Sequence, residues 1–166
     1  MKGRLWMGVA AAALVWSTGT PAEIFVGAGV GRAEIDDSAR GLSLDDTATG
    51  WKFYGGMLLT ENFGFEAGWT DLGDMNKGGV DVETEAFYAA GIASLPIGGD
   101  FSIYGKVGFA FWDQDVNTVS FDGTDLMYGV GAKFKFMDQF HVRVEWEQYE
   151  ADLETSMISI GAGLQF

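Results

Sequence analysis

The chain has 166 residues, which is enough for one domain and short for two. Its 24 acidic residues outnumber 10 lysines and arginines, so the formal net charge is -14. This charge excludes nonspecific electrostatic binding of nucleic acid, which needs a basic surface. Cysteine is absent, which excludes disulfides, thiol nucleophiles and cysteine-based metal sites. Aromatic residues reach 14% in this acidic chain, which indicates that some apolar surface faces lipid.

The first 22 residues have the organisation of a secretory signal peptide. Lys2 and Arg4 precede an uncharged run over residues 5–16, and Thr20 and Ala22 are small residues at the positions of a cleavage site. The run is too short to cross about 30 Å of hydrocarbon as a helix. We therefore predict that residues 1–22 are removed on export and that residues 23–166 form one domain.

The rest of the chain alternates with period two, which only strands produce. Near the C-terminus, Phe140, Val142, Val144 and Trp146 are apolar, while His141, Arg143, Glu145 and Glu147 between them are ionisable. Eight segments of this kind can be marked, at residues 24–34, 50–59, 63–72, 83–95, 101–113, 124–136, 140–149 and 155–166.

The connections between these segments differ in length. Short turns are predicted at 60–62, 96–100 and 137–139, whereas longer polar loops are predicted at 35–49, 73–82 and 114–123. Residues 150–154 make a short connection at the long-loop end. Short turns at one end and longer loops at the other are typical of outer-membrane barrels.

The composition of the two strand faces distinguishes a membrane barrel from a soluble one. A soluble β-sandwich or lipocalin-type barrel would place Lys, Thr and Glu on the face opposite its apolar side chains. Here that face is rich in glycine, which suits a narrow lumen. Aromatic residues near the segment ends suit two membrane interfaces, with Trp51, Trp69, Tyr128 and Trp146 at one and Phe63, Phe101, Phe136, Phe140 and Phe166 at the other. The predicted fold is all-β, an eight-stranded antiparallel up-and-down transmembrane β-barrel.

Three stretches carry a family resemblance: Phe63-Gly64-Phe65-Glu66-Ala67-Gly68-Trp69, Ile103-Tyr104-Gly105-Lys106-Val107-Gly108 and Arg143-Val144-Glu145-Trp146. With them, the chain resembles the eight-stranded transmembrane domain of the outer membrane protein A family. The resemblance implies a charged cluster in the lumen, to which Glu66, Lys106, Arg143 and Glu145 correspond. Two positions depart from the family pattern, because Ile92 replaces an interior lysine and Lys133 replaces an acid.

The alternation itself predicts a charged lumen cluster. Lys106, Lys133, Lys135 and Arg143 can face Glu66, Glu145 and Glu147, and an ionised group in a narrow lumen must be paired. The predicted cluster is Glu66, Lys106, Lys133, Arg143 and Glu145. It is interpreted either as a fixed polar core or as an ion path controlled by switching salt bridges. The fixed core is preferred because eight strands leave little room for water.

Acidic residues gather around the longer loops. Eighteen of the 24 acids lie there: Glu34, Asp36, Asp37, Asp45, Asp46, Asp71, Asp74, Asp81, Glu83, Glu85, Asp113, Asp115, Asp122, Asp125, Glu147, Glu150, Asp152 and Glu154. They can form a solvated, mutually repelling rim, or they can recruit divalent cations that bridge to lipopolysaccharide phosphates. No spacing makes an EF-hand loop, so no metal site is assigned.

Enzymatic activity is not predicted. His141 is the only histidine, and no serine lies one or two residues away in the sequence. Ser159 on the next strand is the nearest plausible nucleophile, and a serine hydrolase needs histidine, serine and a carboxylate in reach. Gly27, Gly29 and Gly31 lack the later glycine and following helix of a dinucleotide loop. No cofactor is expected.

The C-terminal residues resemble the signal read by the barrel assembly machinery. Phe166 is the final residue, and Leu164, Ala162 and Ile160 precede it at alternating positions. We therefore expect Phe166 and Leu164 to act as an assembly signal in the outer membrane of a Gram-negative bacterium. The predicted function is non-enzymatic and supports envelope integrity, with acidic loops exposed at the surface. A small low-conductance channel and a surface adhesin are the alternatives.

Overall fold

The computed structural model describes residues 23–36, 47–71, 75–77, 80–116, 119–150 and 154–166. Within these ranges the strands are β1 (Glu23–Asp36), β2 (Thr47–Leu58), β3 (Phe63–Asp71), β4 (Met75–Lys77), β5 (Val80–Gly98), β6 (Phe101–Val116), β7 (Val119–Phe136), β8 (Phe140–Glu150) and β9 (Glu154–Gln165). The predicted signal peptide lies outside the described residues.

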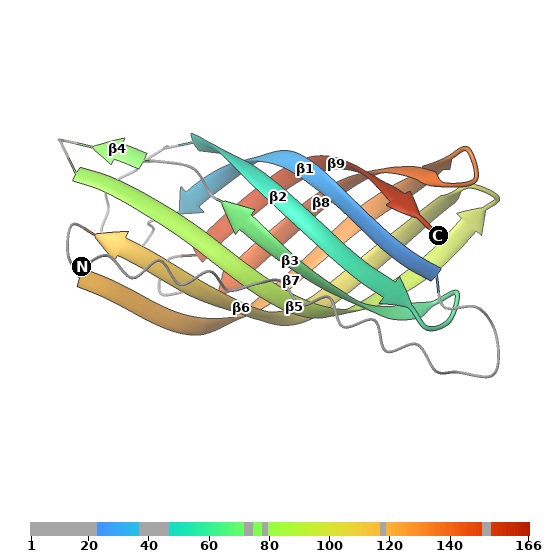
Figure 1. Cartoon of the computed structure of the whole chain (residues 1–166), viewed down its shortest axis with the longest axis horizontal. Helices are drawn as coiled ribbons and strands as arrows, with labels where there is room; N and C mark the ends of the chain where they lie inside the picture. The colour runs from blue at the N-terminus through green and yellow to red at the C-terminus, as the bar shows by residue number, and fades with distance from the viewer. Residues whose placement is uncertain (1–22, 37–46, 72–74, 78–79, 117–118, 151–153) are drawn as a thin grey trace.

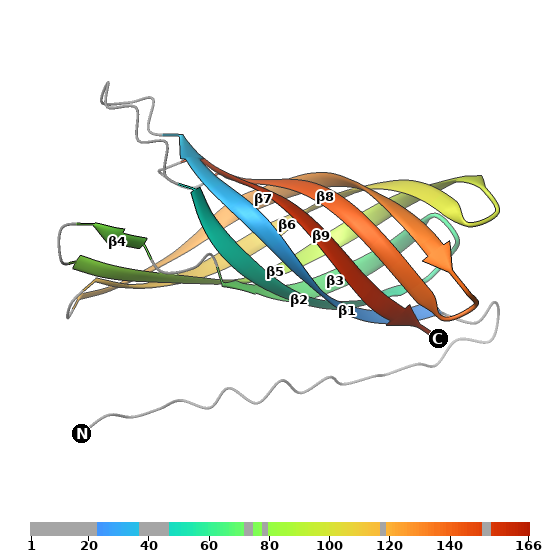
Figure 2. The same ribbon diagram turned by 90° about the horizontal axis from the view of Figure 1, so that it is seen from above.

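The long strands form a closed antiparallel barrel (Figure 1). β1 pairs with both β2 and β9, which lie side by side with it in Figure 2. Pairing of β3 with β5 completes the ring. The predicted eight-stranded up-and-down barrel is therefore confirmed, with β4 as a short extra strand paired only to the end of β5.

Two of the predicted loop boundaries are wrong. The sequence predicts a loop over residues 114–123, but β6 and β7 continue through most of this stretch and Val116 pairs with Val119. It also predicts a loop over residues 73–82, yet this range contains β4 and the start of β5. Backbone hydrogen bonds extend these hairpins past the point where apolar alternation stops, because the ladder itself does not require apolar side chains.

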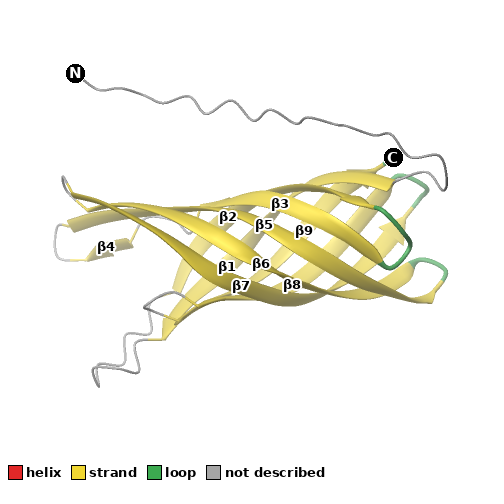
Figure 3. Ribbon diagram, turned by 90° about the horizontal axis from the view of Figure 1, so that it is seen from below, coloured by secondary structure: helices red, strands yellow, loops and turns green. Residues whose placement is uncertain are grey.

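One predicted turn is shorter than expected. β5 continues through Pro96 to Gly98, with a register shift between these two residues. Proline is tolerated in a strand at such an irregularity, where the ladder is already interrupted. The three described turns all lie at the barrel end that carries the C-terminus, as Figure 3 shows. This end is called the short-turn end below, and the opposite one the long-loop end.

The outer surface of the barrel is apolar. Most predicted aromatic interface residues are exposed there, with Trp51, Phe63, Phe136, Phe140 and Phe166 each exposing more than half of their surface. Trp69 stacks on Phe53 and Trp146 contacts Tyr128, so these rings are partly covered by neighbours on the same face. In water such a surface would be strongly unfavourable, whereas it matches hydrocarbon. No helix in the described ranges has the length and hydropathy of a membrane-spanning helix.

The lumen is filled by rings that lie against glycines. Four cross-strand pairs place a glycine directly opposite an inward ring: Gly27 with Tyr54, Gly68 with Tyr88, Gly131 with Tyr104, and Gly163 with His141. A Cβ added to any of these glycines would collide with the ring of its partner. The glycines predicted to suit a narrow lumen therefore provide the space in which the rings lie flat over the neighbouring strand.

The lipid face predicts a depth-dependent cost for charge on β8. Val144 is half exposed near the middle of the strand, and Gln148 lies on the same face nearer the long-loop end. Val144→Arg is expected to lower the free energy of unfolding by about 2–4 kcal/mol, and Gln148→Arg by about 0–1 kcal/mol. Denaturant titration in lipid vesicles measures both values. Equal costs at the two positions would contradict the assigned membrane depth.

The glycine–ring packing makes a second prediction. A Cβ at Gly131 would lie 2.6 Å from the Tyr104 ring, whereas at Gly105 the nearest atom, the Gly129 carbonyl oxygen, is 3.8 Å away. Gly131→Ala is expected to destabilise the barrel by about 1–3 kcal/mol through overpacking. Gly105→Ala, the matched control, should be neutral or stabilising by about 0.5–1 kcal/mol, because alanine loses less backbone entropy. The same unfolding titration distinguishes them, and a similar loss for both variants would contradict the packing account.

Candidate functional site

The lumen contains a charge layer built from four strands. Strand alternation turns His141, Arg143, Glu145, Glu147 and Tyr149 of β8 inward. Facing strands contribute Lys52 from β2, Glu66 from β3 and Lys106 from β6. The three charged residues of β8 (Arg143, Glu145 and Glu147) and the three from the facing strands are each at most 5% exposed, so these six charges are out of contact with bulk water. The name charge layer is used below for Lys52, Glu66, Lys106, Arg143, Glu145 and Glu147.

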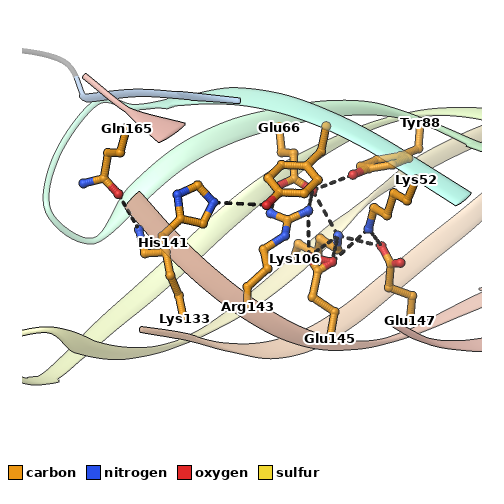
Figure 4. A network of polar contacts seen from close by, with 11 residues as sticks. Lys52, Glu66, Tyr88, Lys106, Lys133, His141, Arg143, Glu145, Glu147 and Gln165 are labelled. Carbon is orange, nitrogen blue, oxygen red and sulfur yellow. Dashed lines mark hydrogen bonds and ion pairs between the residues drawn. The ribbon is translucent and has the colours of Figure 1, made fainter. Parts of the chain in front are cut away.

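Arg143 and Glu66 form the first pair of the charge layer (Figure 4). Arg143 Nη1 donates to Glu66 Oε2 at 2.5 Å, and Nη2 lies 2.8 Å from Glu145 Oε1. The guanidinium therefore bridges carboxylates from two different strands. Charge-assisted hydrogen bonds of this length are stronger than neutral ones, and they fix the orientation of both partners.

Two lysines complete the layer. Lys106 Nζ lies 3.0 Å from Glu66 Oε1, 2.9 Å from Glu145 Oε2 and 2.6 Å from Glu147 Oε1. Lys52 Nζ lies 2.8 Å from Glu145 Oε2 and 2.6 Å from Glu147 Oε1. Each ammonium is shared among carboxylates, because its three protons can be donated in different directions.

Tyrosine rings support the cations from both sides. Tyr88 donates its hydroxyl proton to Glu66 Oε1 at 2.6 Å, while Lys52 and Lys106 lie 4.9 and 5.0 Å from its ring centroid. The Arg143 guanidinium carbon lies 3.1 Å from the Tyr54 ring centroid. Cation–π attraction is strongest where water is excluded, as it is here.

The charge layer is neutral as a unit. Its three cations balance its three carboxylates, and every member takes part in at least two ion pairs. Burying an isolated ion would cost several kcal/mol, and the mutual pairing offsets that cost. Removal of a single member therefore leaves an uncompensated charge in the lumen.

Apolar layers lie on both sides of the charge layer. On the long-loop side are Ala33, Tyr88, Ala90, Ala110, Met127, Tyr149 and Met157. On the short-turn side are Phe25, Tyr54, Leu58, Ile92 and Tyr104. The order along β6 shows the arrangement, since Tyr104, Lys106 and Ala110 follow one another from the short-turn end. The charges are thus enclosed along the barrel axis as well as around it.

The predicted lumen residues do not all lie together. Glu66, Lys106, Arg143 and Glu145 meet in the charge layer, but Lys133 lies nearer the short-turn end and donates to Gln165 Oε1 at 3.4 Å. Lys135, also predicted to face the lumen acids, pairs instead with Glu23 at 3.0 Å. Ile92, which departs from the family pattern, packs in the apolar layer on the short-turn side.

Sequence reasoning missed Lys52 and Tyr88 as members of the site. Lys52 stands between the outward-facing Trp51 and Phe53, and Tyr88 stands between an outward-facing phenylalanine and an alanine. The period-two alternation could therefore have placed both side chains inside the barrel. The assignment of Glu147 to the acids of the rim is wrong. Glu147 is fully buried in the charge layer, because it stands two residues after Glu145 on β8 and therefore lies on the same face of the strand.

Most of the predicted acidic rim lies outside the residues with described side chains. Among those described, Asp71, Glu85, Asp125 and Glu150 are at least partly exposed near the long-loop end. In the described part of the chain, no group of three histidines, aspartates or glutamates is placed to hold a metal ion. Cation recruitment by the rim therefore stays a prediction.

His141 and Ser159 are far apart along the sheet. His141 pairs with Gly163, whereas Ser159 pairs with Glu145, four residues further along the strand. At roughly 3.3 Å per residue this separates them by about 13 Å. The histidine Nε2 instead lies 3.1 Å from the Tyr54 hydroxyl.

The C-terminal residues form the seam of the barrel. Phe166 exchanges two backbone hydrogen bonds with Ile24, of 2.8 and 3.0 Å, and its side chain is 67% exposed on the outer face. Leu164 pairs with Val26 on the same outward face. Both side chains are accessible at the short-turn end, where the predicted assembly signal lies.

Comparison with known proteins agrees with this architecture. The solved structures similar to the chain include the attachment invasion locus protein Ail of Yersinia pestis, at 19% identity and a TM-score of 0.68, with 89% of this chain and 100% of that chain covered. Neisserial surface protein A matches at 12% identity and a TM-score of 0.71, with the same coverage. The N-terminal β-barrel domain of Pseudomonas aeruginosa OprF matches at 16% identity and a TM-score of 0.64, covering 86% of this chain and 97% of that domain.

A search of curated proteins finds no match. The family model for the outer membrane protein beta-barrel domain matches residues 5–166. This match covers every described strand, and the apolar outer surface and enclosed polar lumen agree with it. The chain therefore belongs to the outer membrane protein beta-barrel family, whose members lie in the outer membrane of Gram-negative bacteria.

Proposed function

We propose that this protein is a non-enzymatic barrel that supports envelope integrity and does not conduct ions through its lumen. The observation that carries the proposal is the neutral charge layer enclosed between two apolar layers. An ion crossing the lumen would have to break several short ion pairs and pass apolar rings without its hydration shell. Both steps are costly in a narrow barrel.

The same observations support a non-enzymatic role. His141 is held by Tyr54 rather than by a serine, and the carboxylates of the lumen are used by cations. A general base needs a nucleophile within about 3 Å, either directly or through one water. Glu66, Lys106, Arg143 and Glu145 are accordingly proposed as stabilising residues, together with Lys52 and Glu147.

An adhesin function is a weaker candidate for this chain. Ail of Yersinia pestis has been solved in complex with the heparin analogue sucrose octasulfate, a polyanion. The long-loop segments of the present sequence are mainly acidic, which opposes contact with sulfated polymers through like-charge repulsion. We propose that this acidic end faces the cell exterior, beside the lipopolysaccharide leaflet. Divalent cations then bridge the lipopolysaccharide phosphates and the rim carboxylates.

Export and insertion are proposed to follow the usual order for such barrels. Residues 1–22 direct the chain out of the cytoplasm, and Phe166 with Leu164 is then recognised by the barrel assembly machinery at the short-turn end. Support comes from the exposed Phe166 side chain at the seam between β1 and β9.

The sealed lumen is tested by planar-bilayer recording and unfolding of Glu66→Ala. Wild-type protein is expected to show no steady conductance. Loss of Glu66 should lower the free energy of unfolding by about 3–5 kcal/mol, because Arg143 and Lys106 lose a buried partner. Glu150→Ala, at an exposed position on β8, is the matched control and should change stability by no more than about 0.5 kcal/mol. Wild-type openings, with an altered open fraction in a stable Glu66→Ala barrel, would establish a channel instead.

Recognition at the C-terminus is tested by Phe166→Ser, which keeps both backbone hydrogen bonds to Ile24. Insertion into liposomes that contain the assembly machinery is expected to slow, because the aromatic side chain of the signal is lost. Gln165→Ala changes an inward side chain next to it and should insert at the wild-type rate. Unchanged insertion of Phe166→Ser would show that Phe166 is only a residue of the closing strand.

A further inference from the structure

A small cavity lies in the lumen on the short-turn side of the charge layer. It is lined by Phe25, Leu58, Ile92, Ser94, Tyr104, Lys133, His141 and Arg143. Its volume is about 20 Å³, which accommodates roughly one water-sized particle. Four lining residues give it apolar or aromatic walls, Ser94 contributes a hydroxyl, and the other three carry cationic or imidazole nitrogen atoms. None of these eight lining residues is acidic.

The hydrogen-bond pattern makes His141 a donor toward its surroundings. The Tyr54 hydroxyl lies 3.1 Å from His141 Nε2. We assign this buried hydroxyl as the donor, because Nε2 is the hydrogen-bond partner that it has among the described residues. With Nε2 accepting, the imidazole proton is assigned to Nδ1. His141 is only 1% exposed, and its Nδ1 has no hydrogen-bond partner in the described part of the chain. A buried N–H of this kind requires an acceptor.

Lys133 adds a positive charge that the described carboxylates balance only in part. The charge layer is already neutral, and Arg143 uses its guanidinium on Glu66 and Glu145. Among the described residues, the hydrogen bond of Lys133 is to the neutral Gln165, through a long contact of 3.4 Å. Glu23, an acid at this end of the barrel, pairs with Lys135 at 3.0 Å and also attracts Lys133, so two lysines share one carboxylate. A partly buried ammonium that has only a shared counter-ion is unfavourable.

We propose that this cavity is a binding site for a single small monovalent anion of chloride size. The ligand accepts from His141 Nδ1–H and from the Lys133 ammonium, and it lies beside the Arg143 guanidinium. Its negative charge balances the excess of Lys133 and Lys135 over Glu23, and a monatomic ion suits a space that holds about one water-sized particle. This site does not depend on the proposed envelope function, because a sealed or a conducting barrel could hold the ion equally.

A bound water is the competing occupant of this space. Water can accept from Nδ1–H and would fit the same volume, but it brings no negative charge to the two lysines that share Glu23. The two occupants therefore differ in their dependence on Lys133 and in their response to added halide.

The test is halide binding to the full-length protein purified from outer membranes in detergent. Chloride-35 NMR line broadening is expected to be saturable, and bromide should compete with chloride. Crystals grown with sodium bromide are expected to show anomalous scattering between Lys133 and His141. Lys133→Gln should weaken halide binding at least about tenfold, as expected for loss of a charge-assisted contact. The control is the double variant Glu23→Gln with Lys135→Gln, which removes a neutral ion pair at the same end outside the cavity lining and should change affinity less than about twofold.

Folding of each variant is checked by the mobility of unboiled protein on gels. If Lys133→Gln does not fold, Ser94→Val supplies the same information, because it adds apolar volume to the cavity and keeps every charge. Loss of saturable binding in Ser94→Val supports the site. The proposal is overturned if the wild type shows no saturable broadening or if the cavity holds water in bromide crystals. An equal loss in the Glu23→Gln, Lys135→Gln double variant and in Lys133→Gln would also overturn it, because that result shows that the binding does not depend on Lys133 in the cavity.

Discussion

The narrowness of an eight-stranded lumen is the constraint on which the rest of this structure depends. Lipid covers the outer face, so polar side chains on the strands must turn inward, where little water can accompany them. Lys52, Lys106 and Arg143 therefore have to find their counter-ions within the protein. Glu66, Glu145 and Glu147 supply them at 2.5 to 3.0 Å. The side chains of the charge layer therefore both fill the narrow lumen and neutralise one another.

Glycine makes that solution geometrically possible. The rings of Tyr54, Tyr88 and Tyr104 each lie over a glycine of the adjacent strand, in space that a Cβ would occupy. In these positions Tyr88 and Tyr54 contact the cations of the charge layer, and Tyr104 belongs to the apolar layer on the short-turn side. The fraction of glycine in the strands, costly for an isolated sheet, thus serves the filled interior.

The two sides of the charge layer differ in a way that matters for function. Toward the long loops, methionine, alanine and tyrosine side chains fill the lumen. Toward the short turns, a small cavity remains beside Lys133 and His141, where positive charge exceeds negative among the described lining residues. The proposed sealed lumen thus has a filled long-loop side, and the proposed anion site lies on its short-turn side.

The sequence by itself determined the strand number, the antiparallel order and the face of each strand, because period-two alternation and connection length are local properties. Phe140 to Glu147 illustrate this, since every outward and inward assignment in that run holds. Only the tertiary structure decided which inward charges meet. Strand tilt and register bring Lys52 of β2 to Glu147 of β8 but carry Lys133 of β7 away from the acids. Alternation along a strand decides whether a side chain points into the barrel. Its height along the barrel axis depends on the register between neighbouring strands, which alternation does not encode.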